Sequence, residues 1–192
     1  MKKNNIRRMT TASLLIALIV VLQLLGYALP KVGPFGLSFV LIPVVIGAAY
    51  LGVAYGAVLG GVFGVVVCIC CFNGMDVGGQ MVWQANPLMC IIVVMLKGIL
   101  AGAASGFVYK ILSQRNAYIA MLCAAIVCPL LNTGLFLLGM NLFFADVLAA
   151  WAGGSNVVTY MLSGIILVNF VPELIINIVF SPAGQRIIHA IK

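Results

Sequence analysis

Lys97 is the residue in this sequence that most clearly needs a chemical explanation. It lies near the middle of residues 86–115, an apolar stretch long enough to cross a bilayer. A cation at the centre of a membrane helix costs at least about 2.5–3.5 kcal/mol, so such a residue normally faces the protein interior or a wet cavity and has a partner there. Lys97 is therefore the first candidate for a binding site.

Few other polar side chains fall inside apolar segments. They are Gln23, Asn132, Thr133, Asn169 and Glu173. Helices of alternating direction rise by about 1.5 Å per residue, which places Asn132, Thr133 and Asn169 at a depth close to that of Lys97. We expect these four residues to form one polar layer near or above the midplane. Glu173 falls about one and a half turns below Lys97.

Two interpretations of Lys97 remain open. In the structural one, Lys97 pairs with Glu173 and fixes the bundle, which is tolerable only if the buried charges meet in good geometry. In the functional one, its ammonium group binds a carboxylate or another anionic part of a ligand. Asn132 and Asn169 would then supply hydrogen-bond donors and acceptors, with Thr133 beside them.

Three connections between the apolar segments are longer and rich in glycine and aromatic residues. They surround Lys31, Asp76 and Asp146. Flexible loops with aromatic side chains over a helical bundle suit the capture of a small molecule. Asn86, Trp83 and Trp151 are the candidate ligand contacts in these loops. The alternative for the tryptophans is an aromatic belt at the membrane interface.

The composition describes an all-α polytopic membrane protein. Of the 192 residues, 65% are hydrophobic and 7% charged, and the mean hydropathy is +1.26, which excludes a soluble domain. The net charge of +7 does not indicate a nucleic-acid partner, because eight of the ten Lys and Arg residues lie at the two ends or in one interior loop. That distribution instead indicates which side of the membrane each loop and each end of the chain occupies.

A single domain of six membrane-spanning helices accounts for the apolar segments. The expected spans are residues 9–29, 37–51, 54–72, 87–112, 118–140 and 157–180. An even number places the three basic clusters on the cytoplasmic side, together with both termini, and the loops of Lys31, Asp76 and Asp146 outside. The first span resembles a signal peptide, but it is long and lacks an A-x-A cleavage pattern, so we interpret it as a retained anchor.

Catalytic and cofactor motifs are missing from the sequence. It has no G-x-x-x-x-G-K-[ST] phosphate loop and no H-E-x-x-H metal pair. The six cysteines lie in or beside apolar segments without a C-x-x-C motif or a nearby histidine, so we interpret them as small packing residues. No carboxylate pair is placed for acid–base work. We expect no cofactor, no metal and no enzymatic activity.

Small residues at four-residue spacing favour close helix packing. Gly98, Gly102 and Gly106 have this spacing in the segment of Lys97, and four glycines have it in residues 52–64. Ser13 and Ala17 repeat the spacing near the cytoplasmic end of the first segment. There the pair could meet a partner subunit.

Several short motifs taken together resemble a known family. They are FVLIPVVIGA at 39–48, LG at 51–52, YGA at 55–57, GGVFG at 60–64, NPL at 86–88, LKG at 96–98, LNTGL at 131–135 and NFVPELI at 169–175. Their order and spacing resemble the substrate-binding S components of energy-coupling factor (ECF) vitamin transporters. The combination is most similar to the pantothenate-type branch, which tends to carry Pro-Arg where this chain has Leu96 and Lys97.

The resemblance implies a capture subunit in the bacterial cytoplasmic membrane. Such a subunit binds a vitamin from outside the cell and tilts to deliver it. It works with a transmembrane coupling subunit and two cytoplasmic ATPases, and Ser13 and Ala17 would stand for the A-x-x-x-A motif that docks the coupling subunit. Pantothenate or a similar carboxylated vitamin is the expected ligand. The alternatives are riboflavin, pyridoxine, niacin, biotin or a nucleobase-like ligand, or a polytopic protein outside transport.

Overall fold

The computed structural model describes residues 2–28 and 39–191, and every regular element in these ranges is helical. The elements are α1 (Lys2–Ala28), α2 (Leu41–Leu51), α3 (Val53–Phe72), α4 (Val77–Ala85), α5 (Pro87–Leu112), α6 (Ala117–Phe143), α7 (Ala145–Ala152), α8 (Val157–Tyr160), the π-helix η1 (Met161–Phe170) and α9 (Val171–Ile191). The expected all-α class is therefore confirmed. The loop of Lys31 lies outside the described residues.

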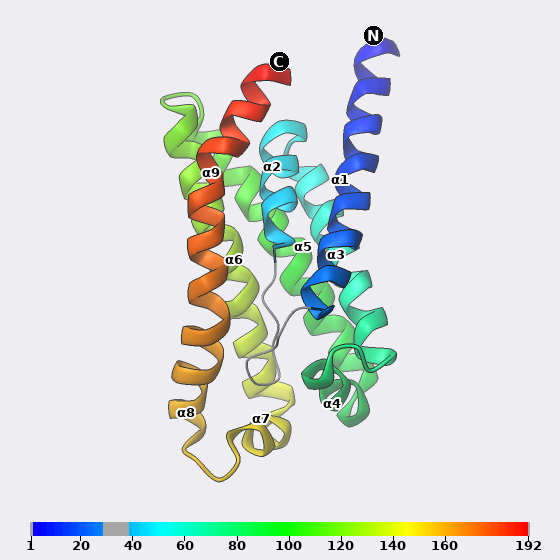
Figure 1. Cartoon of the computed structure of the whole chain (residues 1–192), viewed down its shortest axis with the longest axis vertical. Helices are drawn as coiled ribbons and strands as arrows, with labels where there is room; N and C mark the ends of the chain where they lie inside the picture. The colour runs from blue at the N-terminus through cyan, green and yellow to red at the C-terminus, as the bar shows by residue number, and fades with distance from the viewer. Residues whose placement is uncertain (1, 29–38, 192) are drawn as a thin grey trace.

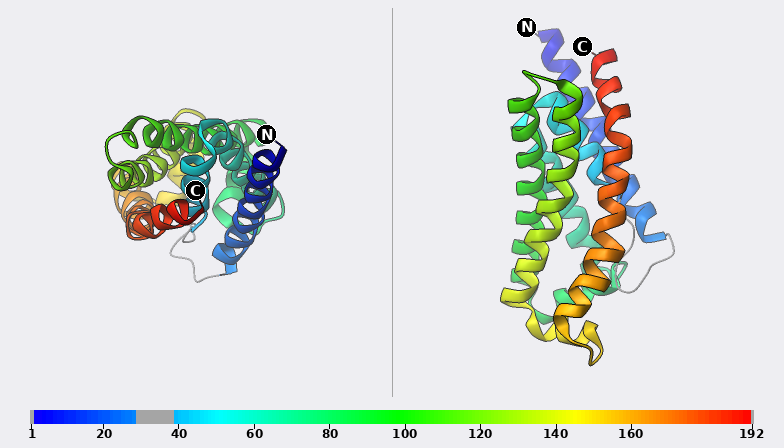
Figure 2. Two further views of the ribbon diagram at one scale, coloured as in Figure 1. Left: turned by 90° about the horizontal axis from the view of Figure 1, so that it is seen from above. Right: turned by 90° about the vertical axis from the view of Figure 1, so that its left-hand side faces the viewer.

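The long helices run side by side as a bundle. Figure 1 shows the two ends of the chain at one end of the bundle and the short helices α4 and α7 at the other. The second view in Figure 2 shows α5, α6 and the continuous rod of α8, η1 and α9 lying together along the whole length of the molecule. The site described below is built near the end that carries α4 and α7 (Figure 1).

Within residues 2–28 and 39–191, five helical segments are long and apolar enough to cross a membrane. They are Asn5–Tyr27, Val53–Phe72, Pro87–Leu112, Ala117–Phe143 and Val157–Ala190. The expected second span is the exception, because its described helix, α2, contains only 11 residues and begins at Leu41. At about 1.5 Å per residue it covers roughly half of a hydrocarbon core. Residues 37 and 38, where we expected this span to begin, lie outside the described ranges.

Helices α3 and α5 approach until their backbones touch. A Cβ atom on Gly60 would overlap the carbonyl oxygen of Gly98, and one on Gly56 would overlap that of Gly102. Only a glycine pair permits this separation, which increases van der Waals contact between helices that have no hydrophobic driving force in lipid. The expectation of close packing by these glycines is confirmed. This contact fixes the position of Lys97, the residue before Gly98, relative to α3.

Two connections that we interpreted as flexible loops contain helices, so that interpretation was wrong. Asp76 caps α4, because its Oδ1 accepts a hydrogen bond of 2.9 Å from the Gly79 amide. Helix α7 buries Leu148 and Ala152 and ends at Gly153, whose positive φ of 57° suits glycine. Local capping and a small apolar face make these segments helical.

Two helices extend beyond the segments that we expected to span the membrane. Helix α1 begins at Lys2, before the expected start of the span near Met9, and the side chains of residues 5–10 are exposed. The last helical rod continues to Ile191 rather than ending near Phe180. Its final turns bury Ile188 and Gln185, so tertiary contacts extend the helix beyond the apolar segment. The remaining long helices match the expected spans within a few residues.

Candidate functional site

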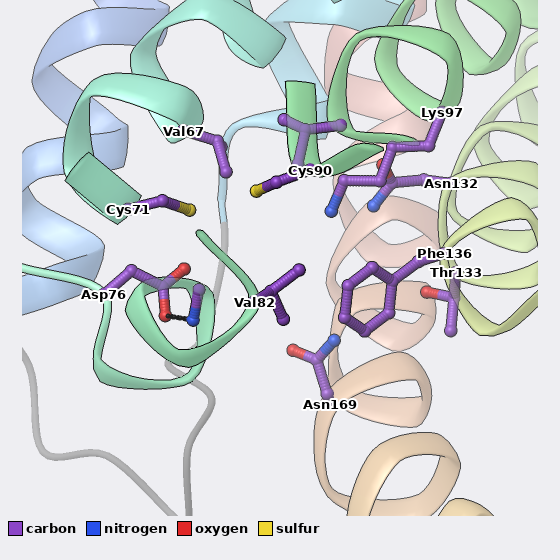
Figure 3. A pocket seen from close by; sticks show the side chains of 12 residues that line it. Val67, Cys71, Asp76, Val82, Cys90, Lys97, Asn132, Thr133, Phe136 and Asn169 are labelled. Carbon is purple, nitrogen blue, oxygen red and sulfur yellow. Dashed lines mark hydrogen bonds between the residues drawn. The ribbon is translucent and has the colours of Figure 1, made fainter. Parts of the chain in front are cut away.

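A pocket lies between α3, α4, α5, α6 and η1 (Figure 3). Its lining residues are Val67, Cys71, Asp76, Gly79, Val82, Cys90, Val94, Lys97, Asn132, Thr133, Phe136 and Asn169. Its volume is about 70 Å³, which is room for several water molecules. Apolar walls with a few convergent polar groups are typical of sites for small ligands.

The four residues of the expected polar layer line this pocket together. Lys97 comes from α5, Asn132 and Thr133 come from α6, and Asn169 comes from η1. Figure 3 shows the Lys97 ammonium group beside the Asn132 amide on one wall, with Asn169 on the side towards α8. The depth estimate was sufficient here because the rise of a helix is nearly constant.

Asn132 and Thr133 hold polar atoms with unused hydrogen-bonding capacity. The two residues are 6% and 5% exposed. Among the described residues, Asn132 Oδ1 and Thr133 Oγ1 have no hydrogen-bond partner. Buried polar groups are nearly always paired, so such atoms on the wall of a pocket require an explanation. A ligand with N–H or O–H groups would supply the missing partners.

Aromatic rings surround the Lys97 ammonium group. Its Nζ lies 4.7 Å from the centroid of Phe136 and 5.8 Å from that of Phe63. Each such cation–π contact is worth about 0.5–2 kcal/mol. Glu173, one turn beyond Asn169, lies outside the lining that the described residues form and is 2% exposed. The contacts of Lys97 thus place it in the pocket wall.

Asp76 is a site residue that the sequence analysis did not select. Besides capping α4, its Oδ2 accepts a hydrogen bond of 3.1 Å from the Tyr27 hydroxyl group. Its carboxylate therefore lines the pocket on the side of α4 (Figure 3). An aspartate directly before an apolar segment is a helix N-cap signal, and this signal would have placed it on an ordered element. The pocket combines a cation on α5 with an anion at α4.

Phe136, Cys71 and Cys90 were also missed. Phe136 follows Asn132 by four residues and Thr133 by three, so helical periodicity alone places it on the same face of α6. Cys71 lies near the end of α3 and Cys90 near the start of α5. These helix ends meet because α4 reverses the chain between them. That meeting could not be read from the sequence, because it depends on the fold of α4.

Three candidate ligand contacts lie outside the pocket lining. Asn86 is exposed and caps α5 by accepting a hydrogen bond of 3.1 Å from the Met89 amide. The Trp83 ring packs edge-on against Phe72, with centroids 5.7 Å apart. The Trp151 indole N–H contacts the Met81 sulfur at 3.2 Å, which ties α7 to α4. These side chains hold the end of the bundle together around the pocket.

Ser13 and Ala17 lie on the exposed face of α1, whereas Leu15 and Ile19 face the core. The small pair therefore does not pack against the described part of the chain. A flat face bordered by Leu14 and Leu18, which are both exposed, remains on the outside of the bundle. The docking role of this pair stays a prediction.

The described residues form only helices, five of them apolar and long enough to cross a membrane, with a polar pocket between them; this arrangement is that of a multi-pass membrane protein able to hold a small polar molecule. The family model described as "ECF transporter, substrate-specific component" matches residues 7–183. The chain belongs to this family and is the substrate-capture subunit of an ECF-type transporter in the cell membrane.

A curated relative gives a more specific similarity. The chain is 29% identical over 196 aligned residues to "Pantothenic acid transporter PanT" of Lactococcus lactis subsp. cremoris (strain MG1363). The alignment covers 95% of this chain and 94% of the relative. The two proteins are therefore similar over nearly their whole lengths, including every helix that lines the pocket.

Proposed function

We propose that this chain captures pantothenate, or a closely similar carboxylated vitamin, in the pocket between α5, α6 and η1. The observation that carries the proposal is the joint placement of the Lys97 ammonium group with the unpaired acceptors of Asn132 and Thr133. The similarity to a pantothenic acid transporter over almost the whole chain supports the same ligand.

The chemistry of pantothenate matches the pocket group by group. Its carboxylate pairs with the Lys97 ammonium group, which contacts aromatic rings and keeps its three N–H donors for a ligand. Its amide N–H group and one hydroxyl group donate to Asn132 Oδ1 and Thr133 Oγ1. The remaining lone pairs of the Asp76 carboxylate accept from a second hydroxyl group. Val67, Val82 and Val94 form apolar parts of the pocket wall, which suit the dimethyl carbon of the ligand.

The proposed topology has six membrane passes with both termini in the cytoplasm. The second pass is the span expected at residues 37–51, of which the structure describes residues 39–51. The pocket then opens outside the cell, on the side of α4 and α7, and the basic residues at the two ends of the chain lie inside. As one membrane domain, the chain works with a transmembrane coupling subunit and two cytoplasmic ATPases, docked through the face of Ser13 and Ala17.

Binding to the purified chain tests the ligand. The detergent-solubilised protein is titrated with pantothenate by calorimetry, and riboflavin, pyridoxine, niacin and biotin are titrated as competitors. We expect saturable binding of pantothenate with a stoichiometry of one, and no displacement by the other vitamins. Saturable binding of a different vitamin would replace the ligand while keeping the capture role. A folded protein that binds none of them would contradict the proposal.

A further inference from the structure

Two cysteines face each other across the pocket. Cys71 lies in the last turn of α3 and Cys90 in the first turn of α5, and both line the cavity. Figure 3 shows the two sulfur atoms pointing towards one another. Both are reduced in this structure.

The pair lines a cavity that also contains a cation and a carboxylate. The Lys97 ammonium group and the Asp76 carboxylate both interact electrostatically with the two thiols. The thiolate is the form that attacks a disulfide. A cavity gives a small reagent access to both sulfur atoms, although each residue is only 1% exposed. Cys128, which is fully buried, does not line this pocket.

We infer that Cys71 and Cys90 form an oxidisable dithiol site inside the capture pocket that takes small-molecule disulfides as its reaction partner. One thiolate attacks a sulfur atom of the disulfide R–S–S–R and expels R–S⁻, which takes up a proton. The second cysteine then attacks the mixed disulfide and expels the other R–S⁻. The two protein thiols are oxidised to a cystine, and one disulfide is reduced to two thiols that carry the protons of the cysteines.

The cross-link changes the shape of the pocket. A disulfide requires a sulfur–sulfur distance of about 2.05 Å, much shorter than that of two thiols in contact. Forming it draws the end of α3 towards the start of α5 and narrows the cavity between them. Resting on the proposed function, we expect the oxidised chain to lose pantothenate binding. Bound pantothenate should in turn shield the pair from oxidation.

Disulfide mapping tests this site without relying on any vitamin. The purified chain is treated with dithiodipyridine, remaining thiols are alkylated, and peptides are analysed by mass spectrometry with and without reductant. We expect a Cys71–Cys90 cystine without a retained thiopyridine group on either residue. Cys71→Ser should instead leave a stable thiopyridine adduct on Cys90, and Cys90→Ser the reverse. The matched control Cys123→Ser, on α6 outside the pocket, should still form the cystine.

Each result of the disulfide mapping either supports or overturns the dithiol site. Cross-links between other cysteines, or adducts that stay on Cys71 and Cys90 in the unmodified chain, would overturn it. If either serine variant fails to fold, the mapping on the unmodified chain still decides. Oxidation at this pair without shielding by pantothenate would support the dithiol site and contradict pantothenate as the occupant of the pocket, so the two proposals fail separately. Recovery of pantothenate binding after reduction would support both.

Discussion

The Lys97 ammonium group lies 4.7 Å from the centroid of the Phe136 ring, and this contact joins α5 to α6 at the level of the pocket. Cation–π attraction offsets part of the cost of holding a charge within the membrane. The attraction uses the face of a ring and no acceptor lone pair. The N–H groups of Lys97 therefore remain suited to a charged ligand.

Replacing Lys97 tests its role as the anion-binding residue. Lys97→Met keeps the length of the side chain and removes its charge. A charge-assisted hydrogen bond is worth about 1.5–3 kcal/mol, so we expect pantothenate affinity to fall roughly ten- to a hundredfold, measured by calorimetry. The matched control is Lys110→Met, which removes a lysine from the exposed far end of the same helix. An unchanged affinity for Lys97→Met would remove Lys97 from the site.

The same variant separates ligand binding from an ion pair with Glu173. If Lys97 neutralised that carboxylate, Lys97→Met would cost about 3–5 kcal/mol of stability, and Glu173→Gln would restore it. Because the contacts of Lys97 are with rings in the pocket wall, we expect the folded protein to persist and the two substitutions to act independently. Thermal unfolding of both single variants and the double variant measures this. Rescue by Glu173→Gln would show that the two charges are coupled.

Helix rise and residue spacing were enough to predict which polar residues of the long helices line the pocket. Lys97, Asn132 and Asn169 converge because straight helices of alternating direction fix their depth, whatever the details of packing. Asp76 was not predicted as a pocket residue because its position depends on α4, a short helix in a segment that we interpreted as a flexible loop. Trp83 was predicted to contact the ligand, but an aromatic residue near a loop serves packing and binding equally well. Only tertiary contacts distinguish a packing ring from a ligand-binding ring.

The glycine contact between α3 and α5 predicts that alanine lowers stability at position 98 but not at position 134. A Cβ at position 98 would overlap the backbone of Gly60, so Gly98→Ala forces the helices apart. We expect it to lower stability by about 1–3 kcal/mol and to weaken ligand binding, because Lys97 moves with α5. In the control Gly134→Ala, an added Cβ has no neighbour within 4 Å, and alanine is a better helix former by about 1 kcal/mol. Equal thermal stability of the two variants would contradict this packing.

The proposed topology predicts which of two glutamines can be labelled from outside the cell. Gln84, on α4, and Gln114, after α5, are both exposed and lie at opposite ends of the bundle. In intact cells, we expect a membrane-impermeant maleimide to label Gln84→Cys above the background of the unmodified chain and to spare Gln114→Cys. Permeabilised cells should show labelling of both. Labelling of Gln114→Cys alone in intact cells would invert the proposed orientation.

Ala17 provides a test of partner docking that leaves the pocket unchanged. Ser13 and Ala17 form an exposed face of small residues on α1, and neither residue lines the pocket. Ala17→Leu fills this face and prevents close approach of another helix. We expect uptake of labelled pantothenate by cells with the complete transporter to be lost, while the purified variant binds pantothenate as the parent does. Ala183→Leu makes the same change at an exposed position of α9 and should leave both measurements unchanged. Equal loss of uptake and binding in Ala17→Leu would mean that α1 uses this face to hold the capture subunit itself together.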